Sequence, residues 1–352
     1  MLILDGHKLN YHADRIAAWQ RGERIAPITI DMALTRVCTY NCQYCYSQLQ
    51  YNPSKELTWS ILSRFLDDCA EIGVKAISLV SDGESTCHRD WVDFIIAGKF
   101  RRINMALGTN GFLITEEDLK RALPYLTYMR FNISAVGSYA YSKIHGCDKS
   151  CYEKVIDNIK NAVRIKKENN LNVTIGLQMV LWKNLSQIIP LAKLGKELGI
   201  DYFVIKHCSD DESNTLKSIN VLDEDLKYYL NAAERLSSKD YQVSVKWSKI
   251  FSKGRLYTHC YGPPFIMQLS GSGLVAPCGM LFAEKYKKYH IGNIANTSFK
   301  ELWQSDKYWE VMRLLEEEHD SKTMCGSLCL QHKVNEYLNT IENCKPQHVN
   351  FI

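Results

Sequence analysis

Residues 37–46 read VCTYNCQYCY, and this loop determines how the rest of the chain is interpreted. Its cysteines Cys38, Cys42 and Cys45 have the spacing C-x3-C-x2-C and follow a strand-like run. Three thiolates from one short loop can hold three irons of a cubane iron–sulfur cluster, which leaves the fourth iron without a protein ligand. An open metal position is typical of a centre that acts on a bound molecule. The loop therefore predicts a catalytic iron–sulfur site.

Three alternatives compete with this interpretation. A zinc site usually shows C-x2-C pairs and four ligands, and a ferredoxin loop carries a fourth cysteine close by. Neither pattern is present around residues 37–46. A chance cluster of buried thiols is disfavoured by the spacing. Tyr44, an aromatic residue directly before the third cysteine, strengthens the iron–sulfur interpretation.

With these residues the loop resembles the signature of the radical S-adenosylmethionine (SAM) enzymes. The resemblance implies that the open iron of a 4Fe–4S cluster chelates SAM and that Tyr44 lies near the adenine. It also implies that SAM is split reductively to a 5′-deoxyadenosyl radical, which takes a hydrogen atom from the substrate. An electron donor such as flavodoxin or ferredoxin is expected.

Composition is that of an ordinary soluble globular protein. Of 352 residues, 46% are hydrophobic and 23% charged, and a net charge of +4 is too small to argue for a nucleic-acid partner. No apolar run is long enough to span a membrane, and residues 1–10 lack the apolar core of a signal peptide. Thirteen cysteines without such a signal favour metal ligation in a reducing, cytoplasmic compartment.

Alternating strand and helix patterns from residue 28 onward predict an α/β fold with a parallel sheet. Strand patterns occupy residues 28–34, 76–80, 103–107, 129–135, 173–181 and 202–206. Helical patterns occupy residues 59–72, 150–167 and 185–198, and Thr115 opens a further helical segment. Ser150 and Glu153 form a predicted capping box for the helix at 150–167. Such sheets carry their chemistry at the carboxyl ends of the strands.

Six such units are too few for an eight-unit barrel. The resemblance implies the same shape, a partial (β/α)6 TIM-like barrel that is open on one side. We expect an N-terminal extension at residues 1–27, the radical SAM partial barrel at 28–245, and a small C-terminal α+β iron–sulfur domain at 246–352.

The turn after the second strand, SDGEST at residues 81–86, contains Glu84. The family has a Gly-Gly-Glu-Pro-like turn here, so the resemblance implies that Glu84 binds the SAM ammonium group. Asp82 replaces the first glycine and Ser85 the proline, which leaves the geometry of the turn open.

Three further polar residues on or after the strands are candidate SAM contacts, Asn110 and Ser134 by the same resemblance. Asn110 belongs to a Thr-Asn-Gly tripeptide after the third strand, where a plain turn is the alternative. Ser134, near the end of the fourth strand, matches a position where a hydroxyl in the family commonly meets the SAM ribose or carboxylate. Gln178 is polar within the apolar run of the fifth strand and needs a partner, which SAM could be. A purely structural role is the alternative for both.

The sixth strand runs into KHCSDD, residues 206–211, which is the densest set of ionisable groups at the expected working edge. Here Cys208 is a candidate catalytic residue that donates a hydrogen atom to a substrate radical. The alternative is a solvated loop with one buried cysteine.

A second group of cysteines follows residue 250, where the strand–helix alternation stops. Cys260 and Cys278 flank a glycine-containing hairpin pattern, and Cys325 and Cys329 open a helical stretch. Four thiolates from separated segments suit a closed iron–sulfur cluster, and zinc would also fit.

The spacing C-x12-G-x4-C resembles the SPASM or shorter Twitch extension of radical SAM enzymes. A full SPASM domain has seven cysteines and only five lie here, so the resemblance implies one auxiliary 4Fe–4S cluster. Its expected ligands are Cys260, Cys278, Cys325 and Cys329, with Cys344 as a spare or alternative ligand.

Three functional hypotheses follow. The first is hydrogen abstraction from a carbohydrate or aminoglycoside-like small molecule, with epimerisation or dehydration as the outcome; the polar loop at 206–211 and the lack of an N-terminal peptide-recognition domain favour it. The second is epimerisation or crosslinking of a ribosomally made peptide, a common activity among SPASM-type enzymes. The third is a non-catalytic iron–sulfur redox sensor.

Overall fold

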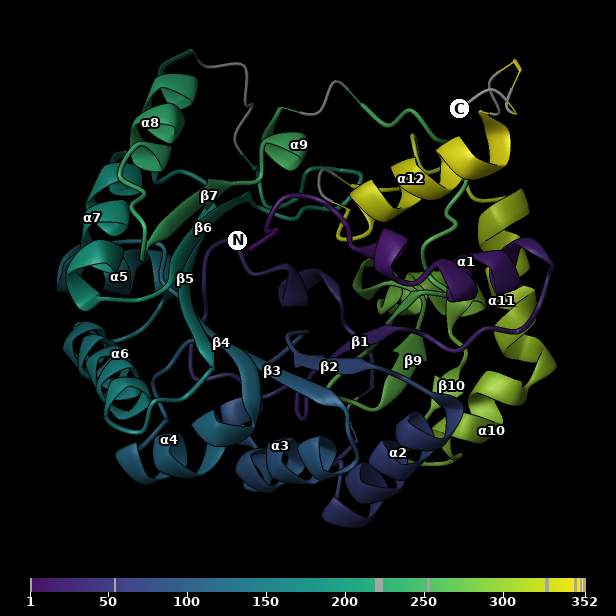
Figure 1. Cartoon of the computed structure of the whole chain (residues 1–352), viewed down its shortest axis with the longest axis horizontal. Coiled ribbons are helices and arrows are strands. Elements are labelled where there is room, and N and C mark those ends of the chain that lie inside the picture. The colour runs from purple at the N-terminus through teal and green to yellow at the C-terminus, as the bar shows by residue number, and fades with distance from the viewer. Residues whose placement is uncertain are drawn as a thin grey trace.

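A curved sheet runs through the protein and positions all other elements (Figure 1). The computed structural model describes residues 2–53, 55–218, 224–251, 254–326, 329–344, 347, 348 and 350. Within these residues the sheet has ten strands in the order β10-β9-β8-β1-β2-β3-β4-β5-β6-β7. All neighbours from β8 to β7 pair in parallel, whereas β9 and β10 are antiparallel additions at one edge.

The strands that form the barrel wall follow one another along the chain. They are β1 (Thr29–Met32), β2 (Ala76–Leu79), β3 (Asn104–Thr109), β4 (Leu126–Asn132), β5 (Thr174–Leu181), β6 (Tyr202–His207) and β7 (Gln242–Val245). Helices surround the outside of this wall (Figure 1). They are α2 (Trp59–Ile72), α3 (Trp91–Phe100), α4 (Glu116–Ala122), α5 (Ser138–His145), α6 (Ser150–Glu168), α7 (Ile188–Leu198) and α8 (Glu224–Glu234). The predicted partial TIM-like barrel is confirmed.

The C-terminal part continues the same sheet beyond β1. Its strands are β8 (Ile266–Leu269), β9 (Leu274–Ala276) and β10 (Gly292–Asn293). Its helices are α9 (Trp247–Ile250), α10 (Phe299–Gln304), α11 (Asp306–Glu317) and α12 (His332–Asn343). The N-terminal helix α1 (Ala13–Gln20) packs against α11 and α12, where Trp19 Nε1 donates to Glu316 Oε1 at 3.3 Å (Figure 1).

Side chains on the strands alternate between the helices and the interior of the barrel. In β4, Met129 and Phe131 are buried under the helices, while Tyr128 and Arg130 are half-buried. The Tyr128 hydroxyl lies 2.7 Å from Ser78 Oγ on β2, across the intervening β3. We call the surface that carries Tyr128, Arg130 and Ser78 the inner face of the barrel.

Local sequence signals explain the best-predicted helix. Helix α2 occupies the predicted residues 59–72 because Thr58 precedes it in an extended conformation and Gly73 ends it with φ at 92°. Its apolar residues, Leu62 and Phe65 among them, repeat at helical spacing and are buried in the core.

Several details differ from the sequence predictions. The capping box predicted for Ser150 and Glu153 is wrong, because Ser150 is already helical and the preceding Asp148 accepts its N–H at 2.8 Å. Strand β4 starts at Leu126 and ends at Asn132, three residues earlier than predicted. Helix α3 was not predicted, since its sequence WVDFIIAGKF is apolar on most sides and shows no helical period.

Two strand relationships were also missed. The short strand β7 extends the wall beyond the six predicted strands. Strand β8 pairs with β1 over Thr29–Met32, although more than 230 residues separate them, so the sheet runs across the expected boundary at residue 245. No helix in the described part of the chain is both long and apolar enough to cross a membrane.

Candidate iron–sulfur and SAM site

The cysteine loop lies at the carboxyl end of β1 and is fastened by backbone hydrogen bonds on both sides. Asn41 N donates to His145 O at 3.2 Å, at the end of α5. Glu84 N donates to Val37 O at 3.0 Å, in the turn after β2. The turn comes this close because residue 83 is glycine: a Cβ there would lie 2.0 Å from Thr35 O. The loop and Glu84 therefore share one edge of the sheet, as predicted for parallel strands.

The three thiols of the loop influence one another. Burial raises the pKa of Cys42 well above its usual value, and the nearby Cys45 and Cys38 thiols raise it further. Burial likewise raises the pKa of Cys38 to about 11. Such thiols give up their protons when positive metal ions take up the charge. A set of three mutually close thiols on one loop fits a cluster that takes three protein ligands.

Hydrogen-bond donors surround these sulfurs. His145 Nδ1 lies 3.3 Å from Cys42 Sγ, and Asn110 Nδ2 donates to Cys38 Sγ at 3.9 Å and to Thr39 Oγ1 at 3.0 Å. Because His145 Nε2 accepts the Ser134 N–H at 3.1 Å, the ring proton is on Nδ1 and faces the sulfur. Burial lowers the pKa of His145 to about 3, so the ring is neutral. Sequence reasoning did not identify His145, because Cys42 is 103 residues away and no motif links them.

The Glu84 carboxylate is 4% exposed and is held by protein donors. It accepts hydrogen bonds from Thr86 N and Oγ1 at 3.1 and 2.8 Å, from Thr109 Oγ1 at 2.9 Å, and from Asn110 N at 2.7 Å. Burial raises the pKa of Glu84, and these hydrogen bonds oppose the rise. The arrangement fixes the carboxylate between the ends of β2 and β3, beside the cysteine loop.

The departure from the family turn at Asp82 has a structural reason. Its carboxylate accepts from Ser270 Oγ at 2.5 Å and from Gly271 N at 2.8 Å, and Arg36 Nε lies 3.2 Å away. Ser270 and Gly271 form the turn between β8 and β9. Asp82 therefore ties the turn that carries Glu84 to the C-terminal hairpin.

Ser134, Tyr44 and Gln178 occupy neighbouring positions. Ser134 Oγ donates to the Tyr44 hydroxyl at 2.9 Å and accepts from Val180 N at 3.1 Å. Gln178 Nε2 donates to Asn132 Oδ1 at 3.0 Å, which joins β5 to β4. The structure thus brings these three predicted residues to the same end of β4 and β5.

Cys208 follows β6 and lies against the cysteine loop. Its side chain is buried, and Sγ donates to Tyr44 O at 3.6 Å and to Ser209 O at 3.2 Å. Burial, and then the charge of Asp210, raise the pKa of Cys208 to about 12, so it remains a thiol at neutral pH.

The second group of cysteines also comes together. Cys260, Cys278, Cys325 and Cys329 line one cavity, and Tyr46 of the cysteine loop is part of its wall. Burial raises the pKa of Cys260 well above its usual value, and the Cys329 and Cys325 thiols add to the rise.

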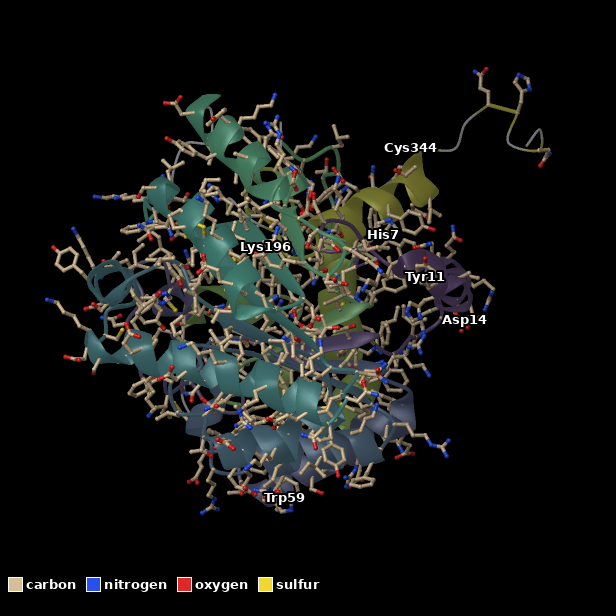
Figure 2. The ribbon with its side chains drawn as sticks, turned by 60° about the vertical axis from the view of Figure 1, so that its left-hand side comes forward. His7, Tyr11, Asp14, Trp59, Lys196 and Cys344 are labelled. Atoms are coloured by element: carbon tan, nitrogen blue, oxygen red, sulfur yellow. The ribbon has the colours of Figure 1, made fainter. Side chains whose placement is uncertain are left out.

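Side-chain nitrogens face two of these sulfurs. Asn335 Nδ2 donates to Cys260 Sγ at 3.4 Å, and His319 Nε2 lies 3.2 Å from Cys325 Sγ. Cys344 is not part of this cavity wall; it is exposed at the outer end of α12 (Figure 2).

Across the described ranges, no three Cys, His, Asp or Glu side chains are arranged as ligands of a single ion. The four C-terminal thiols line one cavity, and thiolates around a shared space can hold the irons of a cubane, which lie at separate corners.

Comparison with known proteins identifies two domains in this chain. The family model for the radical SAM superfamily matches residues 32–194, and the model for the SPASM iron–sulfur cluster-binding domain matches residues 260–330. The AdoMet-dependent heme synthase of Methanosarcina barkeri is 26% identical over 337 residues, which cover 88% of this chain and 90% of that protein. A tungsten-containing aldehyde ferredoxin oxidoreductase cofactor-modifying protein of Pyrococcus furiosus is 21% identical over 79% of this chain and 81% of its own length.

Solved structures show the same fold. Streptococcus suis SuiB bound to S-adenosylmethionine has a TM-score of 0.66 at 18% identity and covers 95% of this chain and 79% of its own. AnSMEcpe with bound AdoMet has a TM-score of 0.58 at 17% identity and covers 92% of this chain and 98% of its own. The two domains imply a SAM-binding 4Fe–4S cluster, an auxiliary iron–sulfur cluster and SAM as cofactors. This chain belongs to the radical SAM superfamily and is an enzyme with a C-terminal SPASM iron–sulfur domain.

Proposed function

We propose that this radical SAM enzyme abstracts a hydrogen atom from a carbohydrate-like small molecule and so epimerises or dehydrates it. The bound cluster and SAM supply the radical chemistry, as a 5′-deoxyadenosyl radical. The SAM-binding cluster would be held by Cys38, Cys42 and Cys45, and the auxiliary cluster by Cys260, Cys278, Cys325 and Cys329. Candidate SAM contacts are Tyr44, Glu84, Asn110, Ser134 and Gln178.

The domain division at 1–27, 28–245 and 246–352 belongs to this proposal, as does reduction by a flavodoxin or ferredoxin. Because the chain is an enzyme, a non-catalytic redox sensor is no longer a candidate function.

Polar groups on the inner face of the barrel support a carbohydrate-like substrate. Tyr128 and Ser78 bond to each other there at 2.7 Å, and Gln178 bonds to Asn132 at 3.0 Å. These polar groups lie on the strands that lead to the candidate SAM contacts. A hydroxyl-rich molecule can exchange hydrogen bonds with such a surface without leaving buried polar groups unpaired.

Cys208 would return a hydrogen atom to the substrate radical in an epimerisation. The donor of a hydrogen atom must keep its S–H bond, and the raised pKa of Cys208, about 12, preserves it. Its position beside Tyr44 O places it next to the cysteine loop. A Cys208→Ala variant assayed in D2O should lose incorporation of solvent deuterium; unchanged incorporation removes this role from Cys208.

Peptide modification is the second candidate. SuiB bound to its precursor peptide SuiA has a TM-score of 0.65 and covers 95% of this chain and 77% of its own. This observation favours a peptide substrate, because it shows the same fold with a peptide bound.

The test of the proposed function is anaerobic. Reconstituted enzyme is incubated with SAM and dithionite, and 5′-deoxyadenosine is measured alone, with candidate sugars, and with candidate precursor peptides. We expect a sugar to stimulate 5′-deoxyadenosine formation and to be consumed with it. Stimulation by a peptide alone would replace the first candidate by the second. A Cys38→Ala, Cys42→Ala, Cys45→Ala triple variant should form no 5′-deoxyadenosine.

A further inference from the structure

Cationic side chains gather on the inner face, level with the candidate SAM contacts and just below them. Arg130 is on β4, Lys206 is on β6, and Lys246 directly follows β7, where its N–H donates to Ile205 O at 2.9 Å. All three are half-buried, and Arg130 and Lys206 alternate with buried neighbours that face the helices. Lys249 on α9 is the fourth member of this group, which we call the basic cluster.

The members of the basic cluster lie close enough to affect one another. Burial lowers the pKa of Lys206 to about 8, and the charges of Arg130 and Lys249 contribute. Burial also lowers the pKa of Lys246 to about 7, with Lys249, Arg130 and Lys206 as further causes. Side chains from β4, β6 and the segment after β7 therefore lie close enough for their charges to interact.

The protein supplies little negative charge to this space. Asp31 on β1 faces the basic cluster, and burial raises its pKa to about 6, so its negative charge is not strongly stabilised. Asp5 is the other acidic neighbour, and its carboxylate already accepts from Ser248 N and Oγ at 3.1 and 2.6 Å. Among the described residues, no carboxylate forms an ion pair within 4.0 Å of Arg130, Lys206 or Lys246, and Arg130 Nε is buried without a hydrogen-bond partner.

A cluster of like charges costs stability, and a ligand of opposite charge relieves that cost. Arg and Lys are the residues that bind carboxylate and phosphate groups, Arg through two parallel N–H donors. The unsatisfied Arg130 Nε is such a donor. The basic cluster is therefore suited to bind an anion that is not part of the protein.

The position of the basic cluster matches that of a substrate. Arg130 precedes Asn132 by two residues and Ser134 by four on the same strand and its extension. At about 3.3 Å per residue Arg130 lies ~7 Å below the Asn132–Gln178 pair and ~13 Å below Ser134. Lys206 pairs with Val180, whose N–H donates to Ser134 Oγ, so Lys206 lies level with Ser134. An anionic group held there lets the rest of a sugar-sized molecule extend towards the SAM contacts.

We infer that the substrate carries a carboxylate or phosphate group that binds between Arg130, Lys206 and Lys246 on the inner face of the barrel. This inference rests on the proposed function and names the substrate class more closely. It disfavours an aminoglycoside, whose ammonium groups would meet four cations.

Binding to the reconstituted holoenzyme with SAM tests the inference by calorimetry. The ligands are glucose 6-phosphate, glucuronate, glucose and glucosamine, together with inorganic phosphate and acetate as minimal anions. We expect the phosphates or the carboxylates to bind at least tenfold more tightly than glucose and glucosamine, and the stronger of the two series identifies the anionic group. High salt should weaken the binding.

Variants locate the site. Arg130→Gln and Lys206→Gln should each weaken anion binding at least tenfold, while iron content and the circular dichroism spectrum show that each variant is loaded and folded. The matched control is Lys196→Gln, the same change at an exposed residue of α7 on the outside of the barrel (Figure 2), and it should bind as the unmodified enzyme does. If Arg130→Gln does not fold, Lys206→Gln carries the test.

Two results would overturn the inference. One is equal affinity for the charged and the neutral sugars, and the other is an unchanged affinity for anions in both the Arg130→Gln and the Lys206→Gln variant. Its failure is distinguishable from that of the proposed function. Anions that bind through Arg130 and Lys206, while no sugar is consumed, would support the anion site and contradict the carbohydrate reaction. If a neutral sugar is consumed and charged sugars bind no more tightly, the carbohydrate reaction would be supported and the anion site contradicted.

Discussion

His145 Nδ1 faces Cys42 Sγ at 3.3 Å, and the orientation of the ring is fixed because Nε2 accepts the Ser134 N–H. The ring also packs on Tyr141 with centroids 4.3 Å apart. A neutral imidazole thus presents its N–H to a sulfur of the cysteine loop. Hydrogen bonds to cluster sulfurs stabilise the more negative, reduced state and raise the reduction potential.

The first prediction concerns this hydrogen bond. His145→Phe keeps an aromatic ring against Tyr141 but removes both nitrogens, so the midpoint potential of the SAM-binding cluster should fall. A redox titration followed by electron paramagnetic resonance measures it, with iron content as the check on loading. His145→Gln, which retains a donor, should recover part of the shift. An unchanged potential in a fully loaded His145→Phe variant would mean that the contact only shapes the loop.

The second prediction concerns Asp82. Its side chain is fully buried, and Arg36, Ser270 and Gly271 all contact it. Removing the carboxylate leaves the Arg36 charge without its partner, so Asp82→Ala should lower the free energy of unfolding by about 3 kcal/mol. Urea denaturation measures the change. The control is Asp93→Ala, which breaks an exposed ion pair with Arg121 and should cost under about 1 kcal/mol. Equal losses in the two variants would show that Asp82 does not hold the hairpin.

The third prediction is a pH dependence of anion binding. Lys246 and Lys206 have pKa values lowered to about 7 and about 8. A lysine is cationic below its pKa, so the basic cluster loses positive charge as the pH rises through this window. Arg130 and Lys249 also face the cluster, and Asp31, with its pKa raised to about 6, stays anionic across the window.

Glucuronate is the suitable ligand, because its carboxylate does not titrate above pH 6. Its affinity for the holoenzyme should fall between pH 6.5 and 8.5. The dependence should flatten in Lys246→Gln and persist in Lys196→Gln. Affinity that rises with pH would contradict the assignment of these lysines.

Local signals predicted the elements whose causes are local. Helix α2 has the extended Thr58 before it, its apolar spacing and its terminal Gly73 within one short segment, and the cysteine loop carries its whole spacing in residues 38–45. Parallel strands then place Glu84, Asn110 and Ser134 at one edge whatever the details of their loops, so the sequence was sufficient to group them.

The missed features depend on residues far apart in the chain. His145 matters because of Cys42, 103 residues earlier, and Asp82 because of Ser270, 188 residues later. The basic cluster has no motif at all: Arg130 and Lys206 are single charges in apolar strands, and only the pairing of β4 and β6 on either side of β5 brings them together. A pattern among neighbouring residues cannot reveal a contact between residues that are far apart in the sequence and meet only in the folded protein.

The fourth prediction separates the two possible roles of the C-terminal cysteines. Cys325 lines the cavity shared with Cys260, Cys278 and Cys329, and His319 Nε2 lies 3.2 Å from its sulfur. Cys344 is exposed at the end of α12 and is no part of that wall.

Cys325→Ala should therefore lose the auxiliary cluster and about half of the bound iron, because two cubanes contribute equal amounts. Cys344→Ala should keep the iron content and the absorption spectrum of the unmodified protein, which makes it the matched control for a cysteine removed from the same region. Iron analysis and electron paramagnetic resonance of both variants decide the matter. If Cys344→Ala loses iron while Cys325→Ala keeps it, the cavity formed by the four thiols is not the cluster site, and the end of α12 must fold back to supply a ligand.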